Sequence, residues 1–430
     1  MDDSILDFQI PTNNGAIIKV IGVGGGGGNA VNHMYLEGIR DVSFALCNTD
    51  NQALMKSPVP TKVQLGVDTT GGLGAGNKPE IAHKAAEESI DILKDLLNDG
   101  TRMAFVTAGM GGGTGTGAAP VVAKVAKDMG ILTVGIVTIP FVFEGERKIV
   151  QALKGVEEIA SNVDALLVIN NERLRDIYSD LTMMNAFAKA DDTLATAAKS
   201  IAEIITIHGY VNLDFADVNT TLKNGGVAIM SRGLGTGKDR VNDAIDDALN
   251  SPLLNNNDVF NAKKILINLS FGEDKPLMME EMNALHNFMA KFSKEIDVIW
   301  GAAVEEDLAD EVKITLLATG FSIKNVPGIN EQIIKENKAV ELENRKREEA
   351  ARIAEEENRK LIEKYYGSNN MTRISNMTMN KAPFILSMDD MNDDSLLDAL
   401  EKTPVFKRER DFNPRNFNTE SHSSSNLFDL

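Results

Sequence analysis

The sequence contains one cysteine, Cys47, and one tryptophan among its 430 residues. A single thiol cannot form an internal disulfide, which excludes a disulfide-stabilised fold and favours a reducing compartment. Basic residues are also scarce, because 44 Lys and Arg stand against 63 Asp and Glu, and the formal net charge is −19. So acidic a surface repels phosphate backbones and anionic lipid headgroups, and we therefore expect no nucleic acid partner.

Long hydrophobic runs are absent as well. The most apolar segment, residues 131–143 (ILTVGIVTIPFVF), is too short to span a bilayer and contains Pro140. The opening residues, MDDSILDFQI, lack the basic and apolar blocks of a signal peptide. We therefore expect a cytoplasmic protein with no direct membrane insertion, which reaches a membrane only through a partner.

The length exceeds what one hydrophobic core organises, and it predicts two folded domains with additional segments. Apolar runs such as residues 16–23 and 102–109 are typical of buried parallel strands, and helical patterns lie between them. This alternation predicts an α/β fold with a Rossmann-like parallel-sheet domain, a long central helix, a smaller α+β domain and a disordered tail. The predicted boundaries are 1–14 for a flexible N-terminal arm, 15–182 for the parallel-sheet domain, 183–209 for the central helix, 210–323 for the α+β domain, 324–402 for a charged, partly helical linker and 403–430 for the C-terminal tail.

Glycine, by contrast, is concentrated. Three short stretches hold sixteen of the 35 glycines: residues 22–28 (GVGGGGG), 71–76 (GGLGAG) and 109–117 (GMGGGTGTG). The first and third each follow a predicted buried strand and precede a predicted helix. At such corners the backbone N–H groups and the helix dipole form an anion site, and the missing side chains let the backbone approach a phosphate. Two such loops predict one polyphosphate ligand held from two sides.

Two other nucleotide-binding patterns compete with this interpretation. A P-loop needs G-x-x-x-x-G-K-[ST], and neither loop contains lysine. Gly22, Gly24 and Gly27 satisfy G-x-G-x-x-G, and Asp50 follows the second predicted strand at the distance of a ribose-binding acid. A Rossmann-type NAD-dependent oxidoreductase is therefore an alternative, although it gives the third glycine stretch no role.

The string GGGTGTG at residues 111–117 resembles the signature of the tubulin/FtsZ family of GTPases. Six more segments are similar to FtsZ segments of that family and follow in the same order between residues 15 and 323: KVIGVGGGGGNAVNHM, NTDNQAL, GLGAGNKPE, PFVFEGERK, NAFAKADD and NLDFADV. The resemblance implies an enzyme that hydrolyses GTP to GDP and phosphate, with Mg²⁺ bound through the phosphates and K⁺ as a further candidate ion. It also implies self-assembly into head-to-tail filaments that form the bacterial cell-division ring, at the division site in the cytoplasm.

Position by position, the resemblance implies a nucleotide site built from several stretches of the chain. The residues are Gly24, Gly25, Gly26 and Asn29 beside the nucleotide; Gly74, Ala75 and Asn77 near the terminal phosphate; Gly111, Gly112, Gly113, Thr114, Gly115, Thr116 and Gly117 around the phosphates; Glu144 and Arg147 at the ribose and phosphate side; and Asn171, Phe187 and Asp191 at the guanine base. Chemistry supports the carboxylate, which can accept two hydrogen bonds from the guanine N1–H and N2 amine, a pair that adenine does not offer. Asp192 is expected on a solvated helix face.

Catalytic groups are harder to find. The five histidines are scattered, no triad or metal-ligand spacing emerges, and we expect no protein-bound metal. The informative polar residues are Asn212, Asp214 and Asp217, since a carboxylate can orient the water that phosphoanhydride hydrolysis requires. At about 1.5 Å per residue, the preceding helix would carry them roughly 30 Å or more from the glycine loops. The resemblance implies that they activate water in the site of the neighbouring subunit. A non-hydrolysing GTP-binding relative is a third hypothesis, which intact Asp214 and Asp217 disfavour.

The tail contains one short motif, TPVFKRER, at residues 403–410. It resembles the C-terminal peptide with which this family docks on membrane-tethering division adaptors such as an FtsA-like protein. An apolar anchor followed by charge, on a flexible segment, suits folding on binding. The adaptor-binding residues implied are Pro404, Val405, Phe406, Lys407 and Arg408, and a solvated basic patch is the alternative.

Overall fold

The computed structural model describes residues 16–39, 41–178, 182–207, 209–251, 259–293 and 296–321. These residues all belong to one unit of the chain, residues 1–334. The N-terminal arm, the charged linker and the adaptor-binding peptide expected from the sequence lie outside the described residues. Within the described part, no helix is long and apolar enough to cross a membrane.

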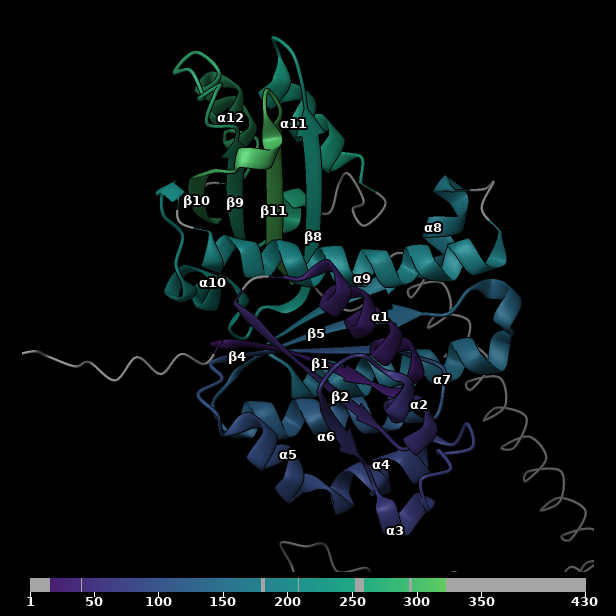
Figure 1. Cartoon of the computed structure of the whole chain (residues 1–430). Helices are drawn as coiled ribbons and strands as arrows, with labels where there is room; N and C mark the ends of the chain where they lie inside the picture. Colours follow the sequence, from purple (N-terminus) through teal and green to yellow (C-terminus); the bar gives the residue numbers. More distant parts are fainter. Residues whose placement is uncertain are drawn as a thin grey trace, which may run out of the picture. The chain divides into compact units, whose positions relative to one another are not determined.

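Six parallel strands form the first half of the sheet, in the order β3-β2-β1-β4-β5-β6 (Figure 1). Their central members are almost entirely buried, as continuous apolar runs predict. This order is that of a doubly wound sheet, in which the direction of winding reverses between β1 and β4. The strands are β1 Ile18–Val23, β2 Val42–Asn48, β3 Thr61–Gln64, β4 Met103–Gly109, β5 Leu132–Ile139 and β6 Ala165–Asn170.

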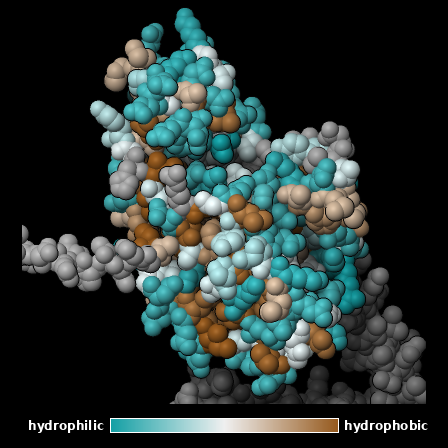
Figure 2. All heavy atoms as spheres, viewed as in Figure 1, coloured by the Kyte–Doolittle hydropathy of each residue, from teal (hydrophilic) through white to brown (hydrophobic). Residues whose placement is uncertain are grey.

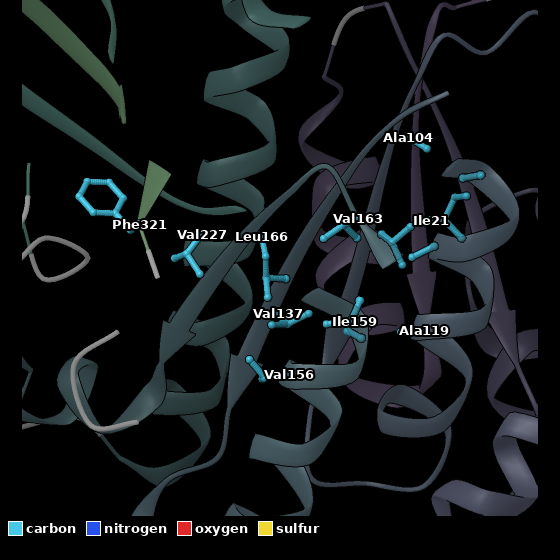
Figure 3. Packing of buried hydrophobic residues seen from close by; sticks show 14 of the residues in the cluster. Ile21, Ala104, Ala119, Val137, Val156, Ile159, Val163, Leu166, Val227 and Phe321 are labelled. Carbon is cyan, nitrogen blue, oxygen red and sulfur yellow. The ribbon is translucent and has the colours of Figure 1, made fainter. Parts of the chain in front are cut away.

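Helices cover both faces of the parallel strands. Helix α1 lies on one face with the long helix α9, while α6 lies on the other face between α4 and α7 (Figure 1). Two hydrophobic cores result, one on each side of the sheet. Figure 3 shows part of one, where Val137 of β5, Ile159 of α7 and Leu166 of β6 lie together. The helices of this half are α1 Gly24–Glu37, α2 Asn51–Lys56, α3 Val67–Thr70, α4 Pro79–Glu88, α5 Ile90–Leu97, α6 Thr114–Asp128, η1 Val142–Glu144, α7 Glu146–Asn162 and α8 Asn171–Ile177.

Helix α9, Met183–Thr206, is the longest described helix. Thr182 caps it, because its hydroxyl accepts a hydrogen bond from the backbone N–H of Asn185. Its buried face is rich in small side chains, among them Ala195, Ala197 and Ala198, which lets the helix lie close to the sheet. At about 1.5 Å per residue, its 24 residues extend about 36 Å.

The rest of the sheet is mixed. Strand β8 pairs in parallel with β6 over only three positions, Ala165 to Leu167, and the sheet continues in the order β8-β11-β9-β10-β7. Strands β8 and β9 both run antiparallel to β11. The α/β class expected from the sequence is therefore confirmed, with a parallel core followed by a smaller mixed part. The remaining elements are β7 Gly209–Val211, α10 Phe215–Leu222, β8 Gly226–Gly235, α11 Arg240–Leu249, η2 Val259–Asn261, β9 Lys264–Phe271, α12 Met282–Met289, β10 Asp297–Val304, η3 Glu306–Leu308 and β11 Val312–Phe321.

Candidate functional site

Two helix N-termini open beside each other at the carboxyl edge of the parallel strands. Strands β1 and β4 are neighbours, with Val23 opposite Ala108, and each passes directly into a glycine-rich corner and a helix. Helix α1 turns to one face of the sheet and α6 to the other. This is the point at which the winding reverses, where ligands of open parallel sheets bind.

The first and third glycine stretches are in direct contact there. A Cβ atom at Gly24 would lie 2.8 Å from the backbone nitrogen of Gly115, and one at Gly26 would lie 3.2 Å from the Cα of Gly109. Gly24 also has a φ of +73°, which side chains rarely adopt. The two loops can approach this closely only because side chains are missing from both.

The second stretch adjoins the third. A Cβ atom at Gly113 would lie 3.0 Å from the backbone nitrogen of Lys78 and 3.1 Å from the Cβ of Ala75. Asn77 lies in the same loop, exposed and with a φ of +59°. The structure thus brings together three glycine stretches that are far apart in sequence.

Other glycines face open space rather than protein. A Cβ atom at Gly25, Gly28 or Gly112 would meet no heavy atom within 4 Å. Gly25 is exposed and Gly112 is half-buried. Since Gly25 is in the first turn of α1 and Gly112 lies just before α6, an anion could approach the backbone at both helix N-termini.

Two side chains that the sequence analysis did not single out shape the third loop. Gln151 of α7 donates from Nε2 to the carbonyl oxygens of Gly111, at 3.1 Å, and Gly112, at 2.9 Å. The hydroxyl of Thr49 lies 2.7 Å from that of Thr114. Gln151 lies outside the segments that carry the resemblance, and Thr49 lies within NTDNQAL but was given no role there. Thr116 accepts a hydrogen bond from the N–H of Gly111 at 2.9 Å and so also holds the loop.

An aromatic group lies at the start of α9. The rings of Phe141 and Phe143 are stacked with centroids 5.1 Å apart, and Phe187 meets Phe141 edge-on at 5.2 Å. Phe187 stays 37% exposed, so part of its ring is free for a further stacking partner. The structure thereby joins the PFVFEGER segment to the NAFAKADD segment.

Asn171 and Asp191, which are expected at the guanine base, have unusual surroundings. The side chain of Asn171 is buried, and its Oδ1 has no hydrogen-bond partner among the described residues. Burial raises the pKa of the Asp191 carboxyl to about 6, and the nearby His33 opposes that shift. A buried acceptor without a partner is costly, and a ligand with N–H groups would relieve that cost.

Glu144 and Arg147, expected at the ribose and phosphate side, differ in their surroundings. Glu144 accepts a hydrogen bond from the N–H of Phe141 at 3.0 Å and pairs with Lys148 at 3.1 Å, so both carboxylate oxygens have protein partners. Arg147 is exposed and lines a cavity of about 580 Å³ between α4, α6 and α7, together with Thr116 and Gln151. That cavity adjoins the residues that hold the third glycine loop.

The candidate catalytic residues Asn212, Asp214 and Asp217 follow the C-terminal end of α9 and lie around the start of α10 (Figure 1). Asp214 caps α10, since its Oδ1 accepts hydrogen bonds from the N–H groups of Ala216 and Asp217. Asp217 Oδ2 in turn accepts from the N–H of Asp214 at 3.0 Å. Asn212 accepts from the N–H of Gly209 at 3.2 Å. Asp214 and Asp217 therefore form a reciprocal capping box at the start of α10.

Each of these acids keeps one oxygen available. Among the described residues, Asp214 Oδ2 and Asp217 Oδ1 make no hydrogen bond. Asp214 is exposed and Asp217 half-buried. The box therefore fixes the orientation of both carboxylates while leaving an acceptor on each.

The fold and the interlocked glycine loops define a nucleotide-binding α/β protein of the GTPase type, and comparisons with known proteins agree. A family model for the GTPase domain of the Tubulin/FtsZ family matches residues 17–179, and one for the C-terminal domain of the FtsZ family matches residues 226–322. The cell division protein FtsZ of Porphyromonas gingivalis is 52% identical over 412 residues, which cover 95% of this chain and 89% of that protein. The chain belongs to the tubulin/FtsZ family of GTPases, on its FtsZ branch.

Solved structures agree with this assignment. An empty FtsZ dimer from M. jannaschii is 39% identical with a TM-score of 0.65, covering 70% of this chain and 88% of that one. CetZ1 from Haloferax volcanii, a GDP-bound monomer, is 22% identical with a TM-score of 0.64, covering 75% and 99%, and shares the fold.

The oxidoreductase alternative is not supported. Gly22 and Gly27 allow close packing of the backbone. A Cβ atom at Gly22 would lie 2.6 Å from the carbonyl oxygen of Gly27, and a Cβ atom at Gly27 would overlap the carbonyl oxygen of Thr107. Asp50, the candidate ribose acid, caps α2 by accepting from the N–H of Gln52 at 2.8 Å.

Proposed function

We propose that this chain hydrolyses GTP in active sites that are each shared between two copies stacked head to tail. The observation that carries the proposal is the separation of the two functional groups along α9. The glycine loops and Phe187 lie toward its N-terminal end, and the acidic loop follows its C-terminal end (Figure 1). About 36 Å of helix prevents one copy from applying its acids to its own nucleotide.

The nucleotide half of the site would be formed by the three glycine stretches. The N-termini of α1 and α6 would bind the phosphates through backbone N–H groups, with the open positions at Gly25 and Gly112 giving access. Asn171, Phe187 and Asp191 would hold guanine. Mg²⁺ would bind through the phosphates and would neutralise their charge, and the hydroxyls of Thr49 and Thr114 offer oxygen ligands of the kind that Mg²⁺ accepts.

The catalytic half would come from the next copy. Asp214 and Asp217, oriented by their capping box, would accept hydrogen bonds from a water and align it on the terminal phosphate. Asn212, beside them, is the third member of this group. Hydrolysis of a phosphoanhydride depends mainly on positioning the water and neutralising charge. The two fixed carboxylates are therefore all that the next copy needs to contribute to the site.

Exposed apolar side chains support association at both ends. Leu73 is 86% exposed in the second glycine stretch, and Met55 is 72% exposed on α2. Tyr210 is 88% exposed just before the acidic loop. Figure 2 shows that apolar residues on the viewed face occur in small groups among hydrophilic ones. Large apolar side chains that are exposed to solvent at two ends of a molecule are typical of surfaces through which copies associate. A contact between unlike ends that does not close produces a filament.

A relative of this chain supports a proposal about its biological setting. The P. gingivalis relative is a cell division protein. We propose that this chain assembles at the division site in the cytoplasm, and that Pro404 to Arg408 bind a membrane-tethering adaptor such as an FtsA-like protein.

The test is GTP turnover per chain as a function of protein concentration, with light scattering recorded in parallel. Turnover should rise as assembly begins and should stay at background in Asp217→Ala at every concentration. A rate per chain that is independent of concentration would contradict the shared site.

A further inference from the structure

Three potential metal ligands meet where α1 lies against α9. His33 and Glu37 are one turn apart on α1, and Asp192 comes from α9. His33 Nε2 lies 3.5 Å from Glu37 Oε1 and 3.7 Å from Asp192 Oδ1. The three donor atoms all lie within 4.8 Å of one another. The sequence analysis expected no such cluster, because Asp192 is brought to the other two only by the fold.

The spacing matches a tetrahedral ion. Zinc–ligand bonds of about 2.1 Å at tetrahedral angles place ligand atoms about 3.4 Å apart. Two of the three separations are within a few tenths of an ångström of that value. The side chains are between 34% and 41% exposed, which leaves room for water at the remaining position.

We propose that His33, Glu37 and Asp192 bind one zinc ion, with water as the fourth ligand. One imidazole nitrogen and two carboxylate oxygens are ligands that zinc accepts. Mg²⁺ prefers six oxygens in octahedral geometry and gains little from an imidazole. None of the three ligands is among the implied nucleotide residues, but the site adjoins Asp191, and the proposal does not depend on the proposed function.

The neighbours of the cluster orient it. Lys189 Nζ lies 2.6 Å from Asp192 Oδ2 and so holds the carboxylate with its other oxygen toward His33. Outer partners of this kind fix the direction of a metal ligand. The carboxylate of Asp191 interacts electrostatically with His33, and its negative charge favours a cation nearby.

Bound zinc would join two elements that carry different parts of the nucleotide site. Helix α1 begins at the first glycine stretch, and α9 carries Phe187 and Asp191. An ion bridging them would stabilise the folded state by an amount that grows with the logarithm of the free zinc concentration once this exceeds the Kd.

A second histidine provides a matched control. His83 also has two carboxylates close by, Glu87 at 3.5 Å and Glu158 at 3.7 Å. Here, however, Glu87 approaches Nδ1 and Glu158 approaches Nε2. Because the two nitrogens face different directions, these groups cannot converge on one ion. His83→Gln therefore removes a similar surface histidine without removing a site.

The experiment is calorimetric titration of Zn²⁺ into the full chain, with GDP and excess Mg²⁺ present to occupy the phosphates. Wild type and His83→Gln should bind one more zinc per chain than His33→Gln. Glu37→Gln and Asp192→Asn should weaken this binding by about tenfold or more. Zinc should raise the melting temperature of wild type but not of His33→Gln.

Folding is checked by the melting temperature without zinc, and if His33→Gln is unfolded, Glu37→Gln takes its place in the comparison with wild type. Equal zinc binding by wild type and by a folded ligand variant would overturn the proposal. A loss of binding in His83→Gln as large as that in His33→Gln would also overturn it.

Discussion

At the scale of single residues, the glycines of the first stretch have two different roles. Some allow backbones to touch, and others leave space free. A Cβ atom at Gly27 would overlap the carbonyl oxygen of Thr107, whereas one at Gly28, the next residue of α1, would meet nothing within 4 Å. Residues 24–28 are five consecutive glycines in the sequence. Their different roles depend on which atoms surround each of them in the structure.

This difference predicts opposite effects of alanine. Gly27→Ala should destabilise the fold by about 2 kcal/mol or more, because the strand and helix must separate to admit a methyl group. Gly28→Ala should be neutral or stabilise by up to about 1 kcal/mol, because alanine favours a helix over glycine. Urea unfolding of the two variants checks this. Equal stability of both would contradict the assigned packing role of Gly27.

Cys47 illustrates a buried, unreactive thiol. It is fully buried on β2, and this burial raises its pKa to about 12. Because the thiolate is the nucleophile, native Cys47 should react with iodoacetamide at least about 1000-fold more slowly than in the unfolded chain at mildly alkaline pH. Rapid labelling of the native protein would contradict this.

The same pKa shift has a consequence for stability. The folded state retains the thiol proton more strongly than the unfolded state does. The stabilisation from the protonated, buried Cys47 is therefore complete below about pH 9 and is lost as the pH rises from there toward 12. Cys47→Ala should reduce the alkaline loss of stability, as measured by unfolding over that range.

At the scale of elements, Arg240 joins α11 to the segment before α12. Its Nε donates to Glu281 Oε1 at 2.7 Å, and Nη1 and Nη2 donate to the carbonyl oxygens of Lys275, Pro276 and Asp310. The side chain is 1% exposed. Its hydrogen bonds hold the pKa of the Glu281 carboxyl below its ordinary value. The ionised Glu281 carboxylate therefore adds to the free energy of unfolding above its ordinary pKa, and this stabilisation is lost as the pH falls through its lowered pKa in the folded state.

Removing this guanidinium should be costly. We expect Arg240→Ala to destabilise the protein by about 3 to 5 kcal/mol, because it leaves the Glu281 carboxylate with only the N–H of Met278 as a partner and removes the donor from several carbonyl oxygens. Arg240→Lys should rescue little, because an ammonium cannot reproduce the forked geometry. Lys238→Ala, at an exposed neighbouring position, is the control. Hydrogen exchange in α11 and α12 should report the loss, and unchanged exchange would contradict it.

The capping box at α10 separates a structural role from a chemical one. An amide oxygen can still accept the hydrogen bond from the N–H of Asp214, so Asp217→Asn should change the free energy of unfolding by less than about 1 kcal/mol. It removes the charge, however, and should lower GTP turnover by about 100-fold or more. Turnover near wild type would limit Asp217 to capping.

At the scale of the whole molecule, the sequence predicted the α/β class and the strand–glycine–helix corners, because those patterns are local. Residues 16–23 and 102–109 are largely apolar, and both contain the expected strands. The implied site residues and the domain boundaries remain predictions. The features that the sequence could not supply depend on long-range contacts. Gln151 reaches the third loop from α7, Asp192 meets His33 across two helices, and β6 pairs with β8 over three residues.

The central claim, that acids from one copy act on the nucleotide of the next, is tested most directly by mixing two inactive variants. Gly25→Glu places a carboxylate in the open space at the phosphates and keeps the acidic loop, whereas Asp214→Ala keeps the glycine loops and lacks a catalytic acid. Turnover is measured in pelleted filaments shown to contain both chains. The shared site predicts a rate well above the sum of the two variants alone. A rate equal to that sum would contradict it.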